Sequence, residues 1–96
     1  MLDIKRFEGR DLVFYKNRAI ALLEQYDSTD HGWIDTPGVI IVGARKGYNL
    51  VGVAYARPVG AGFETQVVIQ DAYKGFNVDA KLTEELLHHL PQKAMA

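Results

Sequence analysis

The stretch "QDAYKGFNVDAKLTEELL", Gln70 to Leu87, passes from a strand ending to an amphipathic helix within a few residues. Gly75 suits a turn, and the apolar residues after it recur at steps of three and four, the period of a helix with one buried face. We predict a helix from about Asp79 to Leu90, ended by Pro91, which cannot continue a helical ladder. Its predicted buried stripe is Val78, Leu82, Leu86, Leu87 and Leu90, and its predicted solvent face carries Lys81, Glu84, Glu85 and His88.

A helix that begins directly after a glycine turn offers unpaired backbone donors at the positive end of its dipole, and such a place binds anions. Gly75 lets a ligand approach the backbone closely, and Lys74 adds a positive charge. A plain strand-to-helix turn has the same local sequence, so both interpretations stay open at this point.

The middle of the chain predicts an antiparallel meander. The β-branched run "VIIVGAR" and the run "LVGVAYARP" are joined by "KGYN", which is typical of a short hairpin turn. We expect Pro58 to end the second strand, "VGAG" to form a loose turn, and "FETQVVI" (63–69) to form a third strand. The uninterrupted apolar run from Val39 to Val42 predicts a strand covered on both faces.

The N-terminal third predicts a strand from Leu2 to Phe7 and then a helix with Asp11 as its N-cap. The helix shows a core-facing period, formed by Leu12, Tyr15, Ala19, Leu22, Leu23 and Tyr26. Residues 27–38 read as a polar connection that Trp33 and Ile34 hold in place. We therefore predict a single domain over 1–96 of the α/β (α+β) class, in the order β-α-β-β-β-α, with a mostly antiparallel sheet.

Composition narrows the classes of function. The 96 residues carry a formal net charge of −1 without a basic stripe, which disfavours nucleic-acid binding. Cysteine is absent, so disulfides and thiolate catalysis are excluded for these residues. No apolar run approaches the roughly 20 residues that span a bilayer, so we expect a soluble, cytoplasmic protein with no membrane partner.

The order of elements and several residues resemble the GNAT superfamily of acyl-CoA-dependent N-acyltransferases. Its strand-to-helix segment runs Val-x-Pro-x-Tyr-Arg-Gly-x-Gly-Ile-Gly-x-x-Leu, and in the same register this chain has Tyr73, Lys74, Gly75, Val78 and Leu82. Leu50-Val51-Gly52 is similar to the family's hydrophobic-Val-Gly step in the third strand. The resemblance implies an acetyl-CoA pyrophosphate site at Lys74, Gly75, Phe76, Asn77 and Val78, with the preceding strand beside the pantetheine arm.

Two positions depart from the resembled motif, because Asn77 and Asp79 stand where the family has glycine. A carboxylate about 4 Å from a phosphate costs about 1 kcal/mol in bulk water and about 4 kcal/mol at a surface-like dielectric. We also expect Asp79 to cap its own helix and so to occupy the amides that a phosphate would use.

The family continues into further strands that this chain lacks after its last helix, so the resemblance implies a GNAT-like fold without the C-terminal strands. An uncovered edge along 63–69 predicts a homodimer, with Phe63, Val67, Ile69 and the last helix at the interface. The alternative is a monomer whose edge is protected by "VGAG" or by the tail "QKAMA".

Three other groups of polar residues are weaker candidates for a functional site. Glu64 lies where some members of the resembled family have a glutamate general base, and a solvent-facing strand residue is the alternative. Glu84 with His88 and Glu85 with His89 have helical spacing, but adjacent histidines point about 100° apart, so we predict no metal site. His31, with Asp27, Asp30 and Asp35 near it in sequence, is predicted to be a surface loop residue.

Two functions follow as hypotheses. The first is a non-catalytic, dimeric binding or interaction module, whose cleft could take a small molecule and whose protein partner is unknown. The second is a minimal N-acetyltransferase that binds acetyl-CoA and whose cleft a partner subunit completes. The first requires no cofactor.

Overall fold

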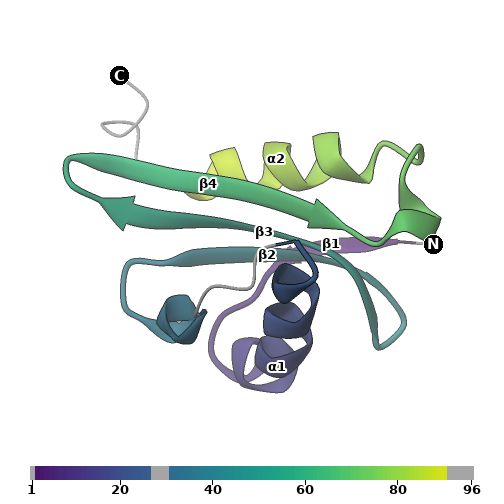
Figure 1. Cartoon of the computed structure of the whole chain (residues 1–96), viewed down its shortest axis with the longest axis horizontal. Coiled ribbons are helices and arrows are strands. Elements are labelled where there is room, and N and C mark those ends of the chain that lie inside the picture. The colour runs from purple at the N-terminus through teal and green to yellow at the C-terminus, as the bar shows by residue number, and fades with distance from the viewer. Residues whose placement is uncertain (1, 27–30, 91–96) are drawn as a thin grey trace.

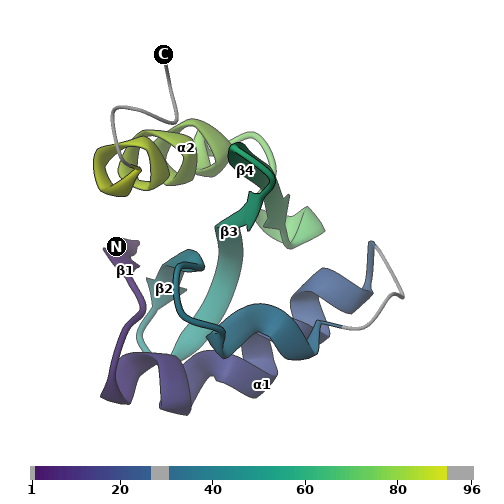
Figure 2. The ribbon, with the colours of Figure 1, turned by 90° about the vertical axis from the view of Figure 1, so that its left-hand side faces the viewer.

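A four-stranded antiparallel sheet separates two helices in the computed structural model, which describes residues 2–26 and 31–90 (Figure 1). The sheet order is β1-β2-β3-β4. Helix α1 covers one face and helix α2 the other, as the view along the sheet shows (Figure 2). The bounds are β1 Asp3–Arg6, α1 Arg10–Glu24, β2 Ile40–Lys46, β3 Asn49–Val59, β4 Gly62–Ile69 and α2 Val78–His89, with short 3-10 turns at Gly32–Asp35 and Asp71–Tyr73. The predicted fold class and order of elements are confirmed.

The core on the α1 side forms around an aromatic stack. Phe7 and Tyr15 lie with ring centroids 4.7 Å apart and planes nearly parallel, and both side chains are buried. A Cβ on Gly43 would come within 2.3 Å of the Phe7 ring, so glycine in β2 gives the ring its place. Around the stack pack Ala19, Leu22, Leu23, Ile34, Ile41, Leu50, Val53, Tyr55 and Val68.

The core on the α2 side depends on a second strand glycine. A Cβ on Gly52 in β3 would lie 3.0 Å from Cδ1 of Leu82, which is fully buried. The glycine therefore lets α2 approach the sheet closely at this point. The buried residues of this layer are Ile40, Val42, Ala44, Val51, Ala54, Ala56, Ile69, Val78, Leu82 and Leu86.

Three sequence expectations about the helices need correction. Helix α1 begins at Arg10 after the N-cap Gly9, so Asp11 is not the cap; its carboxylate instead lies 2.6 Å from Nζ of Lys5. Tyr26 lies beyond the end of α1 and is 45% exposed. Leu87 is 43% exposed. Of the five predicted stripe positions, the three that are fully buried are Val78, Leu82 and Leu86. Pro91 and the tail lie outside the described residues.

Pro58 does not end β3, contrary to the prediction. The strand continues to Val59, and Pro58 pairs with Phe63 of β4. The amide of Gln70 donates to the carbonyl of Val51, and this bond fixes which residues of β3 bond to β4. By alternation Pro58 directs its nitrogen away from β4, toward the side of β2, and β2 begins only at Ile40 opposite Ala56. Proline is tolerated there because no ladder bond is required of its nitrogen.

The β4 strand has a neighbour on one side only among the described residues. The same alternation makes Gln66 and Val68 bond to β3, whereas Phe63, Thr65 and Val67 direct their N–H and C=O groups outward. Strand β4 therefore presents an edge to which a further strand could pair. Separately, no described helix is long and apolar enough to cross a membrane.

Candidate functional site

The segment between β4 and α2 makes two sharp backbone turns. After Ile69, a 3-10 turn covers Asp71–Tyr73, and Gly75 then adopts a φ of 93°, which glycine accepts without strain. Asn77 adopts a left-handed conformation at φ 62°, a region that asparagine enters more readily than most residues. Two contacts tie the segment's start to β3, since Gln70 donates its amide to Val51 and its side-chain Nε2 to the carbonyl of Leu50.

The N-terminus of α2 carries no side-chain cap. Its N-cap residue is Asn77, and no side chain hydrogen-bonds there. Asp79 lies within the first turn and is exposed, so the expectation that Asp79 caps the helix is wrong. The first hydrogen bond of the helix runs from the amide of Lys81 to the carbonyl of Asn77. The amides of residues 78–80 come before it and have no acceptor inside the helix.

Lys74 is paired with a carboxylate and lies beside an aromatic ring. Its Nζ lies 2.9 Å from Oδ1 of Asp71 and 5.4 Å from the ring centroid of Tyr26. The hydrogen bond to Asp71, followed by the attraction of the Asp71 charge, raises the pKa of Lys74. The cation that sequence assigned to a pyrophosphate is therefore already paired.

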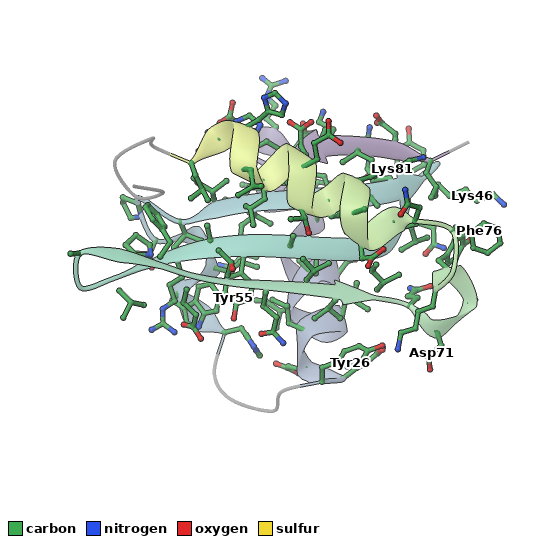
Figure 3. The ribbon with its side chains drawn as sticks, turned by 90° about the horizontal axis from the view of Figure 1, so that it is seen from above. Tyr26, Lys46, Tyr55, Asp71, Phe76 and Lys81 are labelled. Carbon is green, nitrogen blue, oxygen red and sulfur yellow. The ribbon has the colours of Figure 1, made fainter. Side chains whose placement is uncertain are left out.

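Tyr26 completes this group of side chains. Its hydroxyl donates to the carbonyl oxygen of Ile69 at 2.8 Å and lies 3.3 Å from Oδ1 of Asp71. Lys74, and less strongly Tyr26, hold the pKa of Asp71 below its ordinary value of 3.8. Figure 3 shows Tyr26 and Asp71 on the β4 side of this end of the molecule. We call Tyr26, Asp71 and Lys74 the edge cluster.

Sequence reasoning missed Tyr26 as part of the site, because its helical spacing placed it in the core stripe. The hydroxyl at the end of a helix was the only available signal, since tyrosine often keeps one polar end near solvent. Of the predicted cofactor residues, Gly75, Phe76 and Asn77 are exposed in the turn. Val78 is 1% exposed and sits in the α2-side core, so only its backbone could contact a ligand.

Glu64 lies far from the edge cluster. It belongs to the start of β4, and its carboxylate pairs with Arg57 at 3.9 Å. The Arg57 guanidinium in turn lies 4.7 Å from the ring centroid of Trp33. Five steps along the strand, at about 3.4 Å each, place Glu64 about 17 Å from Ile69. The structure therefore does not bring the candidate base and the β4–α2 turn together.

The histidines differ from the sequence expectation in one case. His31 is 3% exposed and packs beside Trp33, so it is not a surface residue; Asp27 and Asp30 lie outside the described residues, and Asp35 pairs with Lys16 at 2.7 Å. His89 Nε2 lies 2.8 Å from Oε2 of Glu85. Within the described parts of the chain, no three His, Cys, Asp or Glu side chains converge as a metal site would require.

The fold is similar to that of ElaA from Escherichia coli, a protein of the GNAT family. The two structures superpose with a TM-score of 0.63 at 16% sequence identity, over 95% of this chain and 73% of ElaA. No protein-family model matches the chain. No curated protein matches its sequence either. The similarity supports a GNAT-like fold, which is the fold that the sequence resemblance predicts.

Proposed function

From a GNAT-like fold, we propose that the chain is a small binding module that does not transfer acyl groups and that pairs with a second copy along the outer edge of β4. The observation that carries the proposal is the outward direction of the backbone groups of Phe63, Thr65 and Val67. An outward N–H needs an acceptor and an outward C=O needs a donor, and either group loses its hydrogen bond to water if an apolar surface covers it. Another strand supplies both.

The side chains of β4 favour a copy of the same chain as the partner. Phe63 and Val67 lie on the α2 face of the sheet and are half-buried against the α2-side core. Two antiparallel β4 strands related by a twofold axis would extend one sheet through both copies and bury these residues further. Burial of apolar surface contributes about 25 cal/mol per Å².

Two placements support a role without catalysis. Glu64 is paired with Arg57 and lies about 17 Å along the strand from the turn, so it is not positioned beside an acyl group bound near Ile69. Lys74 is paired with Asp71 within the edge cluster. The candidate base, Glu64, and the candidate anion-binding cation, Lys74, are thus each paired with another side chain of the same chain.

Light scattering coupled to size-exclusion chromatography tests the proposal. The wild-type chain should elute with twice the monomer mass at micromolar concentrations. Thr65→Pro removes an outward N–H without breaking a β3 bond, and it should produce a monomer. Thr65→Ala keeps the N–H and serves as the matched control, which should remain a dimer.

A wild-type chain that stays monomeric across the micromolar range would show the proposal to be wrong. A Thr65→Pro variant that still dimerises would exclude the β4 edge as the interface. Circular dichroism melts of both variants distinguish loss of pairing from loss of fold, since a folded monomer keeps a cooperative transition.

A second candidate function rests on a separate observation, the absence of a side-chain cap at the N-terminus of α2. Acetyl-CoA could place its pyrophosphate on those amides, with the outer edge of β4 beside its pantetheine arm. A ligand that binds only the folded state adds about 2.7 kcal/mol of stability at 100 times its dissociation constant. Acetyl-CoA should then raise the melting temperature, whereas the binding-module proposal alone predicts no change.

A further inference from the structure

A pocket of about 360 Å³ opens at the end of the sheet where β2 finishes and the β4–α2 turn crosses. Its lining brings together three separate parts of the chain, at Leu2, Lys46, Ala72, Tyr73 and Phe76. Figure 3 shows Lys46 and Phe76 at this end of the molecule, on the β1 side, whereas Tyr26 and Asp71 lie on the β4 side. The pocket is thus separate from the edge cluster.

The walls of the pocket are largely apolar. The ring of Phe76 is 65% exposed, and its centroid lies 6.4 Å from that of Tyr73. Tyr73 is half-buried against the α2-side core, so one wall is anchored to the fold. The left-handed Asn77 follows Phe76 directly and turns the chain into α2, which leaves the Phe76 ring at the surface. An exposed ring beside a concave apolar surface is typical of a site that a ligand covers.

Lys46 gives the pocket its charge. Among the described lysines, Lys5, Lys16 and Lys74 each lie within 3 Å of a carboxylate oxygen. Lys46 and Lys81 have no ion-pair partner in the described parts of the chain, and of these two Lys46 lines the pocket. Asp3, which lies opposite Arg45 in the β1–β2 register, pairs with Arg45, and Asp71, which precedes the lining residue Ala72, pairs with Lys74. An anion entering the pocket would therefore meet an unpaired cation.

We propose that this pocket binds a small monocarboxylate with an aromatic or aliphatic body. The ammonium group of Lys46 holds the carboxylate, and Leu2, Tyr73 and Phe76 cover the apolar body. A single lysine supplies one positive charge, which balances one carboxylate but only part of the charge of a polyphosphate. The site does not involve the outer edge of β4, so it stands independently of the proposed dimer.

The test is a titration of the ¹⁵N-labelled full chain with phenylacetate, followed by the amide resonances in NMR spectra. Saturable shifts are expected at Leu2, Lys46, Tyr73 and Phe76. Phenylacetamide has the same ring without the charge, and acetate has the charge without the ring. Both should bind at least tenfold more weakly than phenylacetate.

Two variants and a matched control locate the site. Lys46→Gln and Phe76→Ala should each weaken phenylacetate binding at least tenfold, and both positions are exposed enough for the fold to survive. Lys16→Gln removes a lysine from the opposite face of the sheet and should leave the affinity unchanged. Equal binding of phenylacetate and phenylacetamide, shifts centred elsewhere, no saturation at millimolar phenylacetate, or full affinity in Lys46→Gln would each overturn the proposal.

Discussion

The hydroxyl of Tyr26 donates a 2.8 Å hydrogen bond to the carbonyl oxygen of Ile69. This bond joins the end of α1 to the end of β4, 43 residues apart in sequence. Because the odd-numbered residues of β4 direct their backbone groups outward, the Ile69 carbonyl belongs to the outer edge. Tyr26 therefore covers the last acceptor of that edge, and Thr65 and Val67 remain available for pairing.

Tyr26→Phe should lower the free energy of unfolding by about 0.5–1.5 kcal/mol, the usual contribution of one hydrogen bond. Urea denaturation followed by tryptophan fluorescence measures the change. Tyr48→Phe is the control, since the Tyr48 side chain is 77% exposed and should lose nothing measurable. Equal stability of the two variants would show that the Tyr26 bond contributes nothing.

The ion pair of Asp71 and Lys74 predicts a pH dependence. The Asp71 pKa is lowered from 3.8 and the Lys74 pKa is raised from 10.5, so the pair contributes its full stability between about pH 4 and pH 10. Its contribution is lost as pH falls through the lowered Asp71 pKa, or as pH rises through the raised Lys74 pKa.

Carboxyl-carbon NMR should therefore give an Asp71 titration midpoint below 3.8. In Lys74→Gln the midpoint should rise, because the largest cause of the shift is removed. The stability difference between wild type and Lys74→Gln should shrink as pH falls through the Asp71 midpoint of the folded wild-type protein, because the carboxyl group then loses the charge that pairs with Lys74. An unchanged midpoint would contradict the pairing seen in the structure.

Gly43→Ala should destabilise the fold by about 1–3 kcal/mol, because the new methyl group overlaps the Phe7 ring. Gly62→Ala is the matched control within a strand, since no atom lies within 4 Å of its Cβ position. That control should be neutral or slightly stabilising. Thermal melts of both variants measure the contrast, and similar losses at the two positions would mean that the ring moves freely.

Leu82→Ala should cost about 2–5 kcal/mol of unfolding free energy, since this side chain of α2 is fully buried between the helix and the sheet. Leu87→Ala, on the same helix and 43% exposed, should stay within about 0.5 kcal/mol of wild type. Urea titrations of the two variants test which part of the predicted stripe faces the sheet. A large loss at Leu87 would indicate that this position is covered by a second copy.

Asp79→Gly tests whether the carboxylate in the first turn of α2 opposes anion binding. Under the second candidate function, acetyl-CoA binds at the N-terminus of α2, and removing a charge repulsion of about 1–4 kcal/mol should tighten that binding at least fivefold. Glu84→Gly carries a similar helix-propensity cost farther along α2 and should leave binding unchanged. Isothermal titration of the three chains gives the comparison, and equal affinities would clear Asp79 as the obstacle.

Much of the fold could be predicted because its signals are local. The β-branched runs at Ile40 and Val67 mark strands, and the three- and four-residue steps through Tyr15 and Leu82 mark helices that cover opposite faces. The register of Tyr73, Lys74 and Gly75 led to a GNAT-like fold, which the similarity to ElaA bears out. The turn between β4 and α2, where sequence places the candidate site, is present, and its function stays a prediction. The contacts of Lys74 with Asp71 and Tyr26 could not be predicted from sequence.

By itself, the sequence determined the order of the helices and strands and most of their buried positions, because propensity and periodicity act over a few residues. Only the tertiary structure decided that Pro58 stays inside β3, that Tyr26 bonds to Ile69, and that Lys46 faces a pocket without a carboxylate partner among the described residues. These outcomes depend on which distant segment arrives beside a residue. That arrangement is set by the packing of both cores, whose residues come from the whole length of the chain, so no short stretch of sequence encodes it.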